Sequence, residues 1–402
     1  MKAIEGGVCA PKGFRASGVA AGIKEGSTKK DCALVVSDNP CAVAGMFTTN
    51  VMKSPPVYRD QEVCERGRAR AVFLNSGNAN AATGVRGHQD MAATVDHVAN
   101  ALGVPAEEVC VCSTGVIGVP LPMDRIAKGI EGSVDALSEE GSLDAATAIM
   151  TTDTEPKSHA VEIEVSGGTV RLGAIAKGAG MVSPKMATMI CIITTDAAFE
   201  SADDLRPLVA DAVEHSFNRI SIDNDMSTSD TVLVLANGAS GTAPLVPESE
   251  DYEAFGAALK ELSRHMAKWL VRDGEGATKF VEISVSGTAT DDEAKTIARA
   301  IGNSQLCKIA FFGEDPNWGR FACAVGYAGV DFDPGALDIY LDGMKICDGG
   351  LAADYEESDA VAIMKQSEYQ LRVSVGSGPG EATFWTSDLS HNYVSINADY
   401  RT

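Results

Sequence analysis

The segment MICIITT, residues 189–195, contains no charged residue and is apolar over most of its length. A strand with one solvated face alternates polar and apolar residues, whereas a strand covered on both faces does not. The preceding segment SHAVEIEVSGGTVRLGAIAKGAG reads as a strand, a Gly-Gly turn and a second strand. We therefore predict that a hairpin leads, through a loop containing glycine and proline, into a strand buried within a sheet, with Thr188 as its first residue.

Helix signals follow this strand twice. In SADDLRPLVADAVEHSF, Ser201 takes the N-cap position and Asp204 lies three residues later, ahead of apolar residues at helical spacing. In TATDDEAKTIARAIG, Thr290 and Glu293 form a capping box. The stretch 369–400 reads as strand, Gly/Pro turn and more strand. Strands and helices in this arrangement predict a layered α/β or α+β protein.

Charge restricts the partners of the chain. Acidic residues outnumber basic residues by 56 to 33, which gives a net charge of −23. Such a charge repels phosphate backbones and anionic lipid. The start, MKAIEGGVCAPKG, lacks the apolar core of a secretory signal, and no apolar run reaches the length of a membrane span. We expect a cytosolic (cytoplasmic) globular protein without a nucleic-acid or membrane partner.

The ten cysteines lie in apolar contexts without a CxxC motif, which favours reduced thiols in a hydrophobic core. Cys110 and Cys112 in EEVCVCSTG are two residues apart on a predicted strand and therefore share a face. Two thiolates do not complete a zinc site, and the six histidines include neither an HExxH nor an HxxxH pair. We expect no metal ion.

Thr188 follows a small residue, Ala187, and precedes the apolar strand. A threonine hydroxyl is a weak nucleophile and needs a neighbouring base, yet the chain has no Ser-His-Asp or Cys-His signature. A threonine at a chain's amino terminus can use its own α-amine, with a pKa of about 8, as that base. One hypothesis is that the chain cleaves itself between Ala187 and Thr188 through an N-to-O acyl shift. The simpler alternative is that Thr188 merely begins a buried strand.

A second candidate feature is the strand end in VCVCSTGVIGVPLP, where Ser113, Thr114 and Gly115 precede a turn. Hydroxyl and backbone donors at such an end can stabilise a developing oxyanion, an effect typically worth a few kcal/mol. An ordinary turn is the alternative. Three other polar segments with glycine, NSGNANAATG, RISIDNDMSTSDT and FFGEDPNWGR, are either parts of a site or hydrogen-bonded loops.

Taken together, these segments resemble the bifunctional glutamate N-acetyltransferase family, also called the ornithine acetyltransferase family. The resemblance covers essentially the whole chain and rests on these motifs, in order: GGVCAPKGFRASGVAAGIK, GMFTTNVMKSPPV, NSGNANAATG, STGVIGVPLP, IMTTDTEPK, KGAGMVSPKMATM, DNDMSTSDT, RDGEGATK, FGEDPNWGR and INADYRT. In that family the precursor cleaves itself before the threonine of KGxGMxxPxMATM, which is Thr188 here. DND at 223–225 departs from the DGD of many members, which bears on the geometry of that loop.

The resemblance implies a layered α/β fold similar to that of the self-cleaving DmpA-like aminopeptidases. It implies two chains, residues 1–187 and 188–402, associated as a heterotetramer of two α and two β chains. The implied reaction belongs to the cyclic route of arginine biosynthesis: N2-acetylornithine acetylates Thr188, ornithine leaves, and glutamate attacks the acetyl-enzyme to give N-acetylglutamate. No cofactor is implied, and acetyl-CoA stays open as a further acetyl donor.

Site residues carry over from the family by motif. Thr188 matches the nucleophile, and Thr114 and Gly115 match the oxyanion hole. The positions that match substrate-binding residues are Thr151, Lys177, Thr188, Glu275, Asn397 and Thr402. A lysine can pair with a substrate carboxylate, and a glutamate with a substrate ammonium group. Two alternatives stay open: an amidase or aminopeptidase in which water deacylates the same threonine, and an uncleaved binding protein for amino acids.

Overall fold

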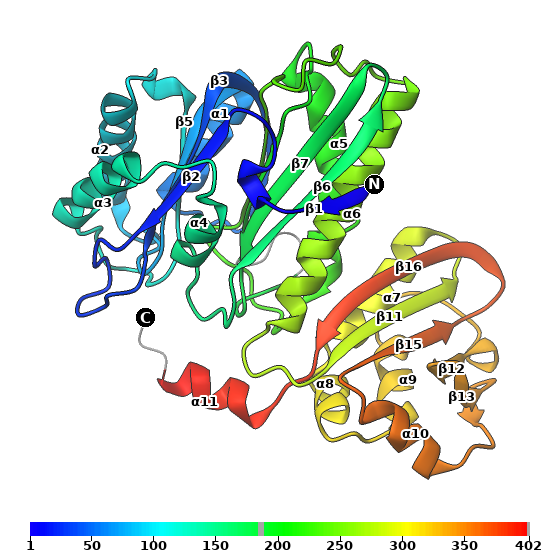
Figure 1. The fold of residues 1–402 in the computed structure, drawn as a ribbon. Coiled ribbons are helices and arrows are strands. Elements are labelled where there is room, and N and C mark those ends of the chain that lie inside the picture. The colour runs from blue at the N-terminus through cyan, green and yellow to red at the C-terminus, as the bar shows by residue number, and fades with distance from the viewer. Residues whose placement is uncertain (184–188, 400–402) are drawn as a thin grey trace.

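The computed structural model describes residues 1–183 and 189–399. Two mixed sheets with flanking helices organise this part of the chain (Figure 1). The strands of the larger sheet are β1 Lys2–Ile4, β2 Phe14–Val19, β3 Cys32–Phe47, β4 Arg68–Asn75, β5 Val109–Ser113, β6 Lys157–Val165, β7 Gly168–Lys177, β8 Ile190–Thr195 and β10 Thr231–Ala236. The strands of the smaller sheet are β9 Ile220–Ser221, β11 Phe280–Gly287, β12 Asp338–Leu341, β13 Met344–Asp348, β14 Leu351–Ala352, β15 Glu368–Ser374 and β16 Gly378–Ser387.

The α-helices are α1 Pro55–Arg66, α2 Gly84–Leu102, α3 Met123–Asp135, α4 Ser142–Ala148, α5 Ala202–Glu214, α6 Glu250–Arg272, α7 Asp291–Asn303, α8 Gln305–Phe312, α9 Trp318–Gly326, α10 Glu357–Met364 and α11 His391–Asp399. Short 3-10 turns are η1 Gly7–Cys9, η2 Ala106–Glu108, η3 Phe217–Arg219 and η4 Pro334–Ala336. The expectation of a layered α/β protein is confirmed.

Strand β8 lies inside the larger sheet, whose order is β1-β6-β7-β8-β10-β3-β4-β5 with β2 paired to β3. Its first residue, Ile190, pairs with Lys177 at the end of antiparallel β7 and with Thr231 at the start of parallel β10. Every residue of β8 is buried, and β6 and β7 form the expected antiparallel hairpin. The predicted buried strand and hairpin are therefore confirmed, whereas the predicted first residue, Thr188, lies outside the described residues.

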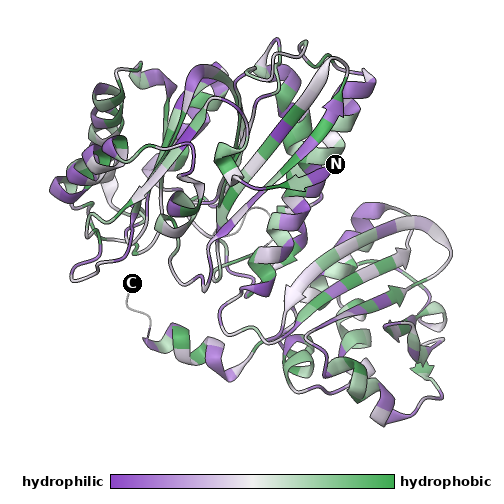
Figure 2. Cartoon of the chain, in the orientation of Figure 1, coloured by the Kyte–Doolittle hydropathy of each residue, from purple (hydrophilic) through white to green (hydrophobic). Residues whose placement is uncertain are grey.

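Helices cover the larger sheet on both faces. A hydrophobic cluster that includes Phe217, Phe255 and Leu259 fills the space between β6, β7, β8 and β10 and the helices α5 and α6. Beyond β10, the helices α2 and α3 cover one face of β3, β4 and β5, while α1 and α4 cover the other. Hydrophobic and hydrophilic residues alternate in bands along α2, α3 and α6 in Figure 2, as expected for helices that bury one face.

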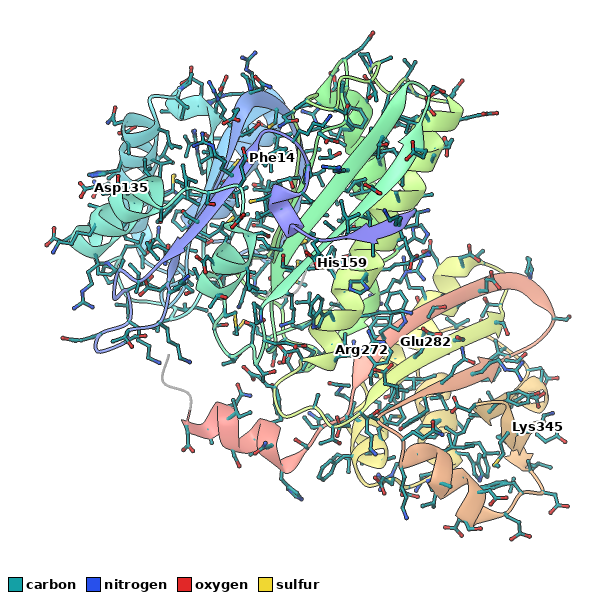
Figure 3. The ribbon with its side chains drawn as sticks, viewed as in Figure 1. Phe14, Asp135, His159, Arg272, Glu282 and Lys345 are labelled. Carbon is teal, nitrogen blue, oxygen red and sulfur yellow. The ribbon has the colours of Figure 1, made fainter. Side chains whose placement is uncertain are left out.

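Helix α6 connects the two sheets. It packs along β6 and β7 and reaches β16 of the smaller sheet, whose order is β14-β13-β12-β15-β11-β16-β9. Lys268 Nζ lies 3.1 Å from Glu282 Oε2 on β11, and Arg272 pairs with both carboxylate oxygens of Glu368 on β15, at 2.7 and 2.9 Å. Figure 3 shows Arg272 and Glu282 at this junction. These ion pairs attach the carboxyl-terminal end of α6 to the second sheet.

The predicted helix starts are confirmed. Ser201 Oγ accepts the Asp203 N–H at 3.1 Å and caps α5. Thr290 Oγ1 accepts the Glu293 N–H at 3.3 Å, and the Glu293 carboxylate accepts the Thr290 N–H at 3.1 Å, which completes the capping box of α7.

The prediction for the carboxyl-terminal stretch is wrong after β16, because residues 391–399 form helix α11 rather than a strand. Ser390 Oγ accepts the Tyr393 N–H at 3.3 Å and donates to the Gly276 carbonyl at 2.6 Å. A helix cap and a tertiary contact therefore outweigh the strand propensity of Tyr393, Val394 and Ile396.

The cysteines are free thiols, and Cys110 and Cys112 are both buried on β5, as predicted. Within residues 1–183 and 189–399, no group of three or more His, Cys, Asp or Glu residues is arranged to hold a metal ion. None of the helices described is both long enough and apolar enough to cross a membrane.

Asp60 on α1 is fully buried against β5. Its carboxylate accepts the Val111 N–H at 2.8 Å and lies 3.4 Å from Cys112 Sγ. Burial raises the pKa of Asp60 to about 7, although these hydrogen bonds oppose the shift. The unfolded carboxyl ionises near pH 3.9, so this group progressively destabilises the folded state as pH rises from about 4 to about 7.

Asp60→Asn keeps an acceptor for Val111 and removes this titration. The melting temperature of the variant, relative to wild type, should therefore rise by several degrees between pH 5 and pH 7 and change little above pH 8. Differential scanning fluorimetry across this range measures the difference. The exposed Asp135 at the end of α3 (Figure 3) gives the control, because Asp135→Asn should show no such trend. A pH-independent difference for Asp60→Asn would contradict the assignment.

Candidate functional site

A cavity of about 330 Å³ lies beside the start of β10, the end of β7 and helix α11. It gathers residues from segments far apart in the sequence: Ala79, Thr114, Gly115, Ile117, Thr151, Thr152, Lys177, Gly180, Met181, Ser227, Thr228, Ser229, Glu275 and Asn397. The candidates Thr114, Gly115, Thr151, Lys177, Glu275 and Asn397 are all among them. Ala187, Thr188 and Thr402 lie outside the described residues.

Lys177 ends β7 and is almost completely buried. Its ammonium group donates to Thr151 Oγ1 at 2.8 Å and to Thr114 Oγ1 at 3.3 Å. Burial lowers the pKa of Lys177, and the carboxylates of Asp153 and Glu275 partly oppose this shift. Because both threonine oxygens accept from lysine, both hydroxyl protons are directed toward other acceptors.

Thr114 follows β5 directly and supplies a hydroxyl to the cavity. Its backbone N–H donates to the Asn75 carbonyl at 3.0 Å, so its side chain is the donor that a ligand can use. Gly115 has φ 127°, and a Cβ there would lie 2.4 Å from the Gly77 carbonyl carbon and 2.6 Å from the Asn78 nitrogen. The STG motif is therefore a tightly packed strand end that only glycine can complete.

The glycines of the KGAG motif place two carboxylates. Gly178 donates its N–H to Asp153 Oδ1 at 2.8 Å. A Cβ on Gly180 would lie 2.5 to 2.6 Å from the carboxylate atoms of Glu275. Glu275 is in turn fixed by its own N–H, which donates to the Ala179 carbonyl at 2.7 Å. The missing side chain at Gly180 thus makes room for Glu275 at the cavity.

Helix α11 brings Asn397 to the same carboxylate. Asn397 Nδ2 donates to Glu275 Oε2 at 2.7 Å and to the Tyr393 carbonyl at 3.0 Å. The Tyr393 hydroxyl donates to Asp223 Oδ2 at 3.1 Å and so anchors the helix. The predicted strand did not explain how Asn397 reaches the cavity, because residues 391–399 form a helix. The INADYRT motif alone indicated that Asn397 belongs to the site.

The loop at residues 223–225 accommodates Asn224 at the position that glycine occupies in the DGD of many family members. Asp223 accepts the backbone N–H groups of Met181 and Val182 at 2.6 and 2.8 Å. Asn224 has φ 65°, the left-handed conformation that glycine adopts freely and asparagine tolerates better than most residues. The substitution therefore preserves the backbone of the loop.

Sequence reasoning missed the ionic cluster of Asp153, Lys157 and Asp273. The Lys157 side chain is fully buried; its ammonium group lies 2.9 Å from Asp153 Oδ1 and also contacts Asp273 Oδ2. Asp153 Oδ2 accepts the Thr151 N–H at 3.1 Å. Burial alone would raise the pKa of Asp153, but the ammonium groups of Lys177 and Lys157 outweigh it and hold this pKa below its usual value. The motifs IMTTDTEPK and RDGEGATK contain all three residues, so the signal was present.

Asp230 was also missed, although the DNDMSTSDT motif contains it. Its side chain is fully buried, and Oδ1 accepts the Met189 N–H at 3.1 Å. Oδ2 has no hydrogen-bond partner in the part of the chain that the structure describes. Burial raises the pKa of Asp230 well above its usual value. A buried carboxyl group therefore contacts the residue that directly follows Thr188.

The fold and the site define a class: an α/β protein with a cavity lined by an ammonium group, a carboxylate and several hydroxyls. The ArgJ family model matches residues 15–402, and the chain belongs to this family. It is 48% identical to the arginine biosynthesis bifunctional protein ArgJ of Symbiobacterium thermophilum over 403 residues, 100% of each chain. The protein of the same name from Geobacter sulfurreducens is 47% identical over 392 residues, 97% of this chain and 99% of that one.

A solved relative adds a structural comparison. The crystal structure of the arginine biosynthesis bifunctional protein from Bacillus halodurans is 36% identical and superposes with a TM-score of 0.50. The match covers 52% of this chain and 98% of that chain. The chain in that crystal is therefore about half as long as this one.

The buried ionic cluster gives a stability prediction. Lys157→Met leaves the Asp153 and Asp273 carboxylates in the interior without their ammonium partner, and breaking such a pair typically costs about 3–5 kcal/mol. Thermal or urea unfolding should show a large loss of stability. Lys2→Met removes the exposed contact with Glu162 and should leave the stability almost unchanged, because solvent screens such a pair. Similar small effects in both variants would contradict the importance of the cluster.

Proposed function

We propose that this enzyme transfers the acetyl group of N2-acetylornithine to glutamate, in the cyclic route of arginine biosynthesis, through an acetyl ester on Thr188. The observation that carries the proposal is the convergence of six motif positions, distant in sequence, on one cavity. Met189, the residue after Thr188, donates its N–H to Asp230, which directly follows the cavity residue Ser229. The names of the relatives support the pathway.

The nucleophile is released by cleavage between Ala187 and Thr188, which gives an α chain of residues 1–187 and a β chain of residues 188–402. The half-length chain of the Bacillus halodurans relative supports two chains of similar size. The hydrogen bond between Asp230 and the Met189 N–H fixes the backbone immediately after the cut. Strand β8 is held on both sides by β7 and β10, and Ile190, two residues after Thr188, pairs with Lys177.

Donor binding uses the two charges of the cavity. The α-carboxylate of acetylornithine pairs with the Lys177 ammonium group, and its side-chain ammonium group pairs with Glu275. The acetyl oxygen then faces the Thr114 hydroxyl and Gly115, the oxyanion hole. Thr151 accepts from Lys177 and Asn397 donates to Glu275, so both residues orient the charged groups that bind substrate. Thr402 completes the substrate-binding set by its motif.

Acetyl transfer then proceeds in two steps. The α-amine of Thr188 takes the proton of the threonine hydroxyl, the oxygen adds to the acetyl carbonyl, and the C–N bond breaks as the ornithine nitrogen receives the proton. The amine of glutamate next attacks the ester carbonyl and forms the new C–N bond, the ester C–O bond to Thr188 breaks, and the threonine oxygen takes the proton that the amine loses. No histidine is among the described residues that line the cavity, which supports the amine as the base.

The active form is a heterotetramer of two α and two β chains in the cytoplasm, without metal or cofactor. The acidic net charge of −23 and the free, mostly buried thiols suit a reducing compartment and small-molecule partners. An amidase is the nearest alternative, because water can deacylate the same ester. The two activities differ in whether acetylornithine is consumed without glutamate.

Expression of the wild-type chain should give two fragments on a denaturing gel, the second with the amino-terminal sequence TMICII. Thr188→Ala removes the hydroxyl that drives both cleavage and transfer, so it should give one intact, inactive chain. Gel analysis, Edman sequencing and an acetyltransferase assay measure these outcomes. Thr28→Ala, at an exposed position, is the matched control and should be cut and active. A cut and active Thr188→Ala enzyme would assign the nucleophile elsewhere.

A covalent intermediate predicts ping-pong kinetics. Double-reciprocal plots against acetylornithine at several fixed glutamate concentrations should be parallel, because ornithine leaves before glutamate binds. Intact-mass analysis after incubation with acetylornithine alone should show one added acetyl group on the chain that begins at Thr188. Intersecting lines without an acetylated chain would indicate direct transfer. Rapid acetylornithine consumption without glutamate would identify the amidase instead.

A further inference from the structure

Self-cleavage needs a proton donor that acetyl transfer does not need. During transfer, the free α-amine of Thr188 takes the proton of the threonine hydroxyl. In the uncut chain the same nitrogen belongs to the peptide bond with Ala187, and a peptide nitrogen donates a hydrogen bond but does not act as a base. It must gain a proton before it can leave as an amine. Another group must therefore supply that proton in the precursor.

Asp230 is the buried acid that contacts the strand beginning after the cleavage site. Its side chain is fully buried, and Oδ1 accepts the N–H of Met189, the residue after Thr188, at 3.1 Å. The N–H of Thr231, directly after Asp230, donates to the Met189 carbonyl at 3.1 Å. Residues 230 and 231 thus engage both backbone polar groups of Met189.

Covalent geometry brings the scissile nitrogen near this carboxyl group. Three bonds separate the nitrogen atoms of Thr188 and Met189, so these atoms are less than about 4 Å apart in any backbone conformation. The second carboxyl oxygen of Asp230, Oδ2, is buried and has no hydrogen-bond partner among residues 1–183 and 189–399. A buried polar atom without a partner calls for an explanation. Transfer of a proton to the adjoining peptide explains why this oxygen is kept free.

The surroundings of Asp230 favour its uncharged form. Burial raises the pKa of Asp230 well above its usual value. Hydrogen bonding by the Met189 N–H and by the Ser227 and Thr48 hydroxyls opposes this shift, and the positive charge of Lys177 opposes it less strongly. These groups belong to the start of β8, the loop before β10, the end of β3 and the end of β7. A carboxyl group in such surroundings can donate a proton at a pH where an ordinary aspartate cannot.

We propose that Asp230 is the acid of self-cleavage and gives its proton to the Thr188 nitrogen as the bond to Ala187 breaks. The inference rests on the proposed function, because it concerns the release of the same Thr188. It assigns a separate residue to the step in which the free amine does not yet exist. Cleavage and acetyl transfer therefore share a nucleophile and differ in the group that moves the proton.

Self-cleavage then takes two steps. The Thr188 hydroxyl oxygen adds to the Ala187 carbonyl carbon and forms a C–O bond, the C–N bond breaks, and the nitrogen takes the proton of Asp230. The hydroxyl proton restores the acid form of Asp230. Water next adds to the ester carbonyl, the C–O bond to the threonine breaks, and the threonine oxygen takes a proton of that water. The products are a carboxyl group on Ala187 and a free α-amine on Thr188.

Solvent supplies this water through the catalytic cavity. Ser227, Thr228 and Ser229, which directly precede Asp230, all line that cavity. Their side chains are hydroxyls, which can hold a water molecule by hydrogen bonds.

The test follows cleavage of the full chain during cell-free translation, with the precursor and its fragments separated on denaturing gels over time. Asp230→Asn keeps an oxygen for the Met189 N–H but cannot act as an acid. Cleavage should therefore slow by about a hundredfold or more, the usual contribution of a positioned acid. Asp225→Asn, at an exposed position in the same loop, is the matched control and should be cut at the wild-type rate. Cleavage of Asp230→Asn at the wild-type rate overturns the proposal.

The pH dependence of cleavage separates an acid from a merely structural role. Fresh wild-type precursor, diluted into buffers of increasing pH, should be cut more slowly as pH rises through the pKa of Asp230, because the carboxylate has no proton to give. The residual cleavage of Asp230→Asn should lack this fall. A wild-type rate that rises with pH over the same range overturns the proposal, since it identifies a base such as Lys177. The wild-type profile decides the question even where Asp230→Asn does not fold.

The two proposals fail in different ways. An uncut Thr188→Ala chain together with normal cleavage of Asp230→Asn refutes the role of Asp230 alone. A Thr188→Ala chain that is still cut refutes the proposed nucleophile instead.

Discussion

The candidate site depends on one buried ammonium group, that of Lys157. It lies between Asp153 and Asp273, and each of these carboxylates also accepts backbone N–H groups of the segment 151–154. Two like charges without Lys157 would repel each other in the protein interior. The cluster thus joins the end of α6 to the start of β6, and its Asp153 carboxylate holds the backbone at Thr151. The cluster of Asp153, Lys157 and Asp273 contributes by holding neighbouring residues in position, and this role requires no contact between its charges and a substrate.

A second constraint is the register of β8. Ile190 pairs with Lys177 and Thr231 on the two neighbouring strands. The end of β7, the start of β8 and the start of β10 therefore lie side by side at the same ends of these strands. Lys177 is the last residue of β7, and Asp230 directly precedes β10. A central strand is shielded on both sides and cannot shift by one residue without turning its apolar side chains the wrong way. The pairing of β8 therefore fixes the backbone at Ile190 relative to Lys177.

Sequence patterns correctly predicted those parts of the fold that depend on interactions between residues close in the sequence. The apolar run of β8, the Gly-Gly hairpin and the capping box at Thr290 depend on neighbours in sequence, and all of them form. Helix α11 did not follow from its residues, because its cap at Ser390 is fixed by a contact with Gly276, more than a hundred positions away. The motif positions named the cavity residues. Lys157 and Asp230 lie in the same motifs, yet their supporting roles follow only from burial and long-range hydrogen bonds.

Electrostatics explains how so acidic a chain can bind carboxylate substrates. The cavity places the Lys177 ammonium group near the carboxylates of Asp153 and Glu275, so its charge is balanced locally rather than by the surface. Burial lowers the pKa of Lys177, and a bound carboxylate would oppose that shift by pairing with the charged form. Substrate and lysine therefore stabilise each other's charge inside the cavity, where solvent screens little. Burial raises the pKa of Asp230 well above its usual value, which favours its uncharged form. The Lys177 ammonium group therefore gives the cavity a contact for a carboxylate although the whole chain carries a net charge of −23.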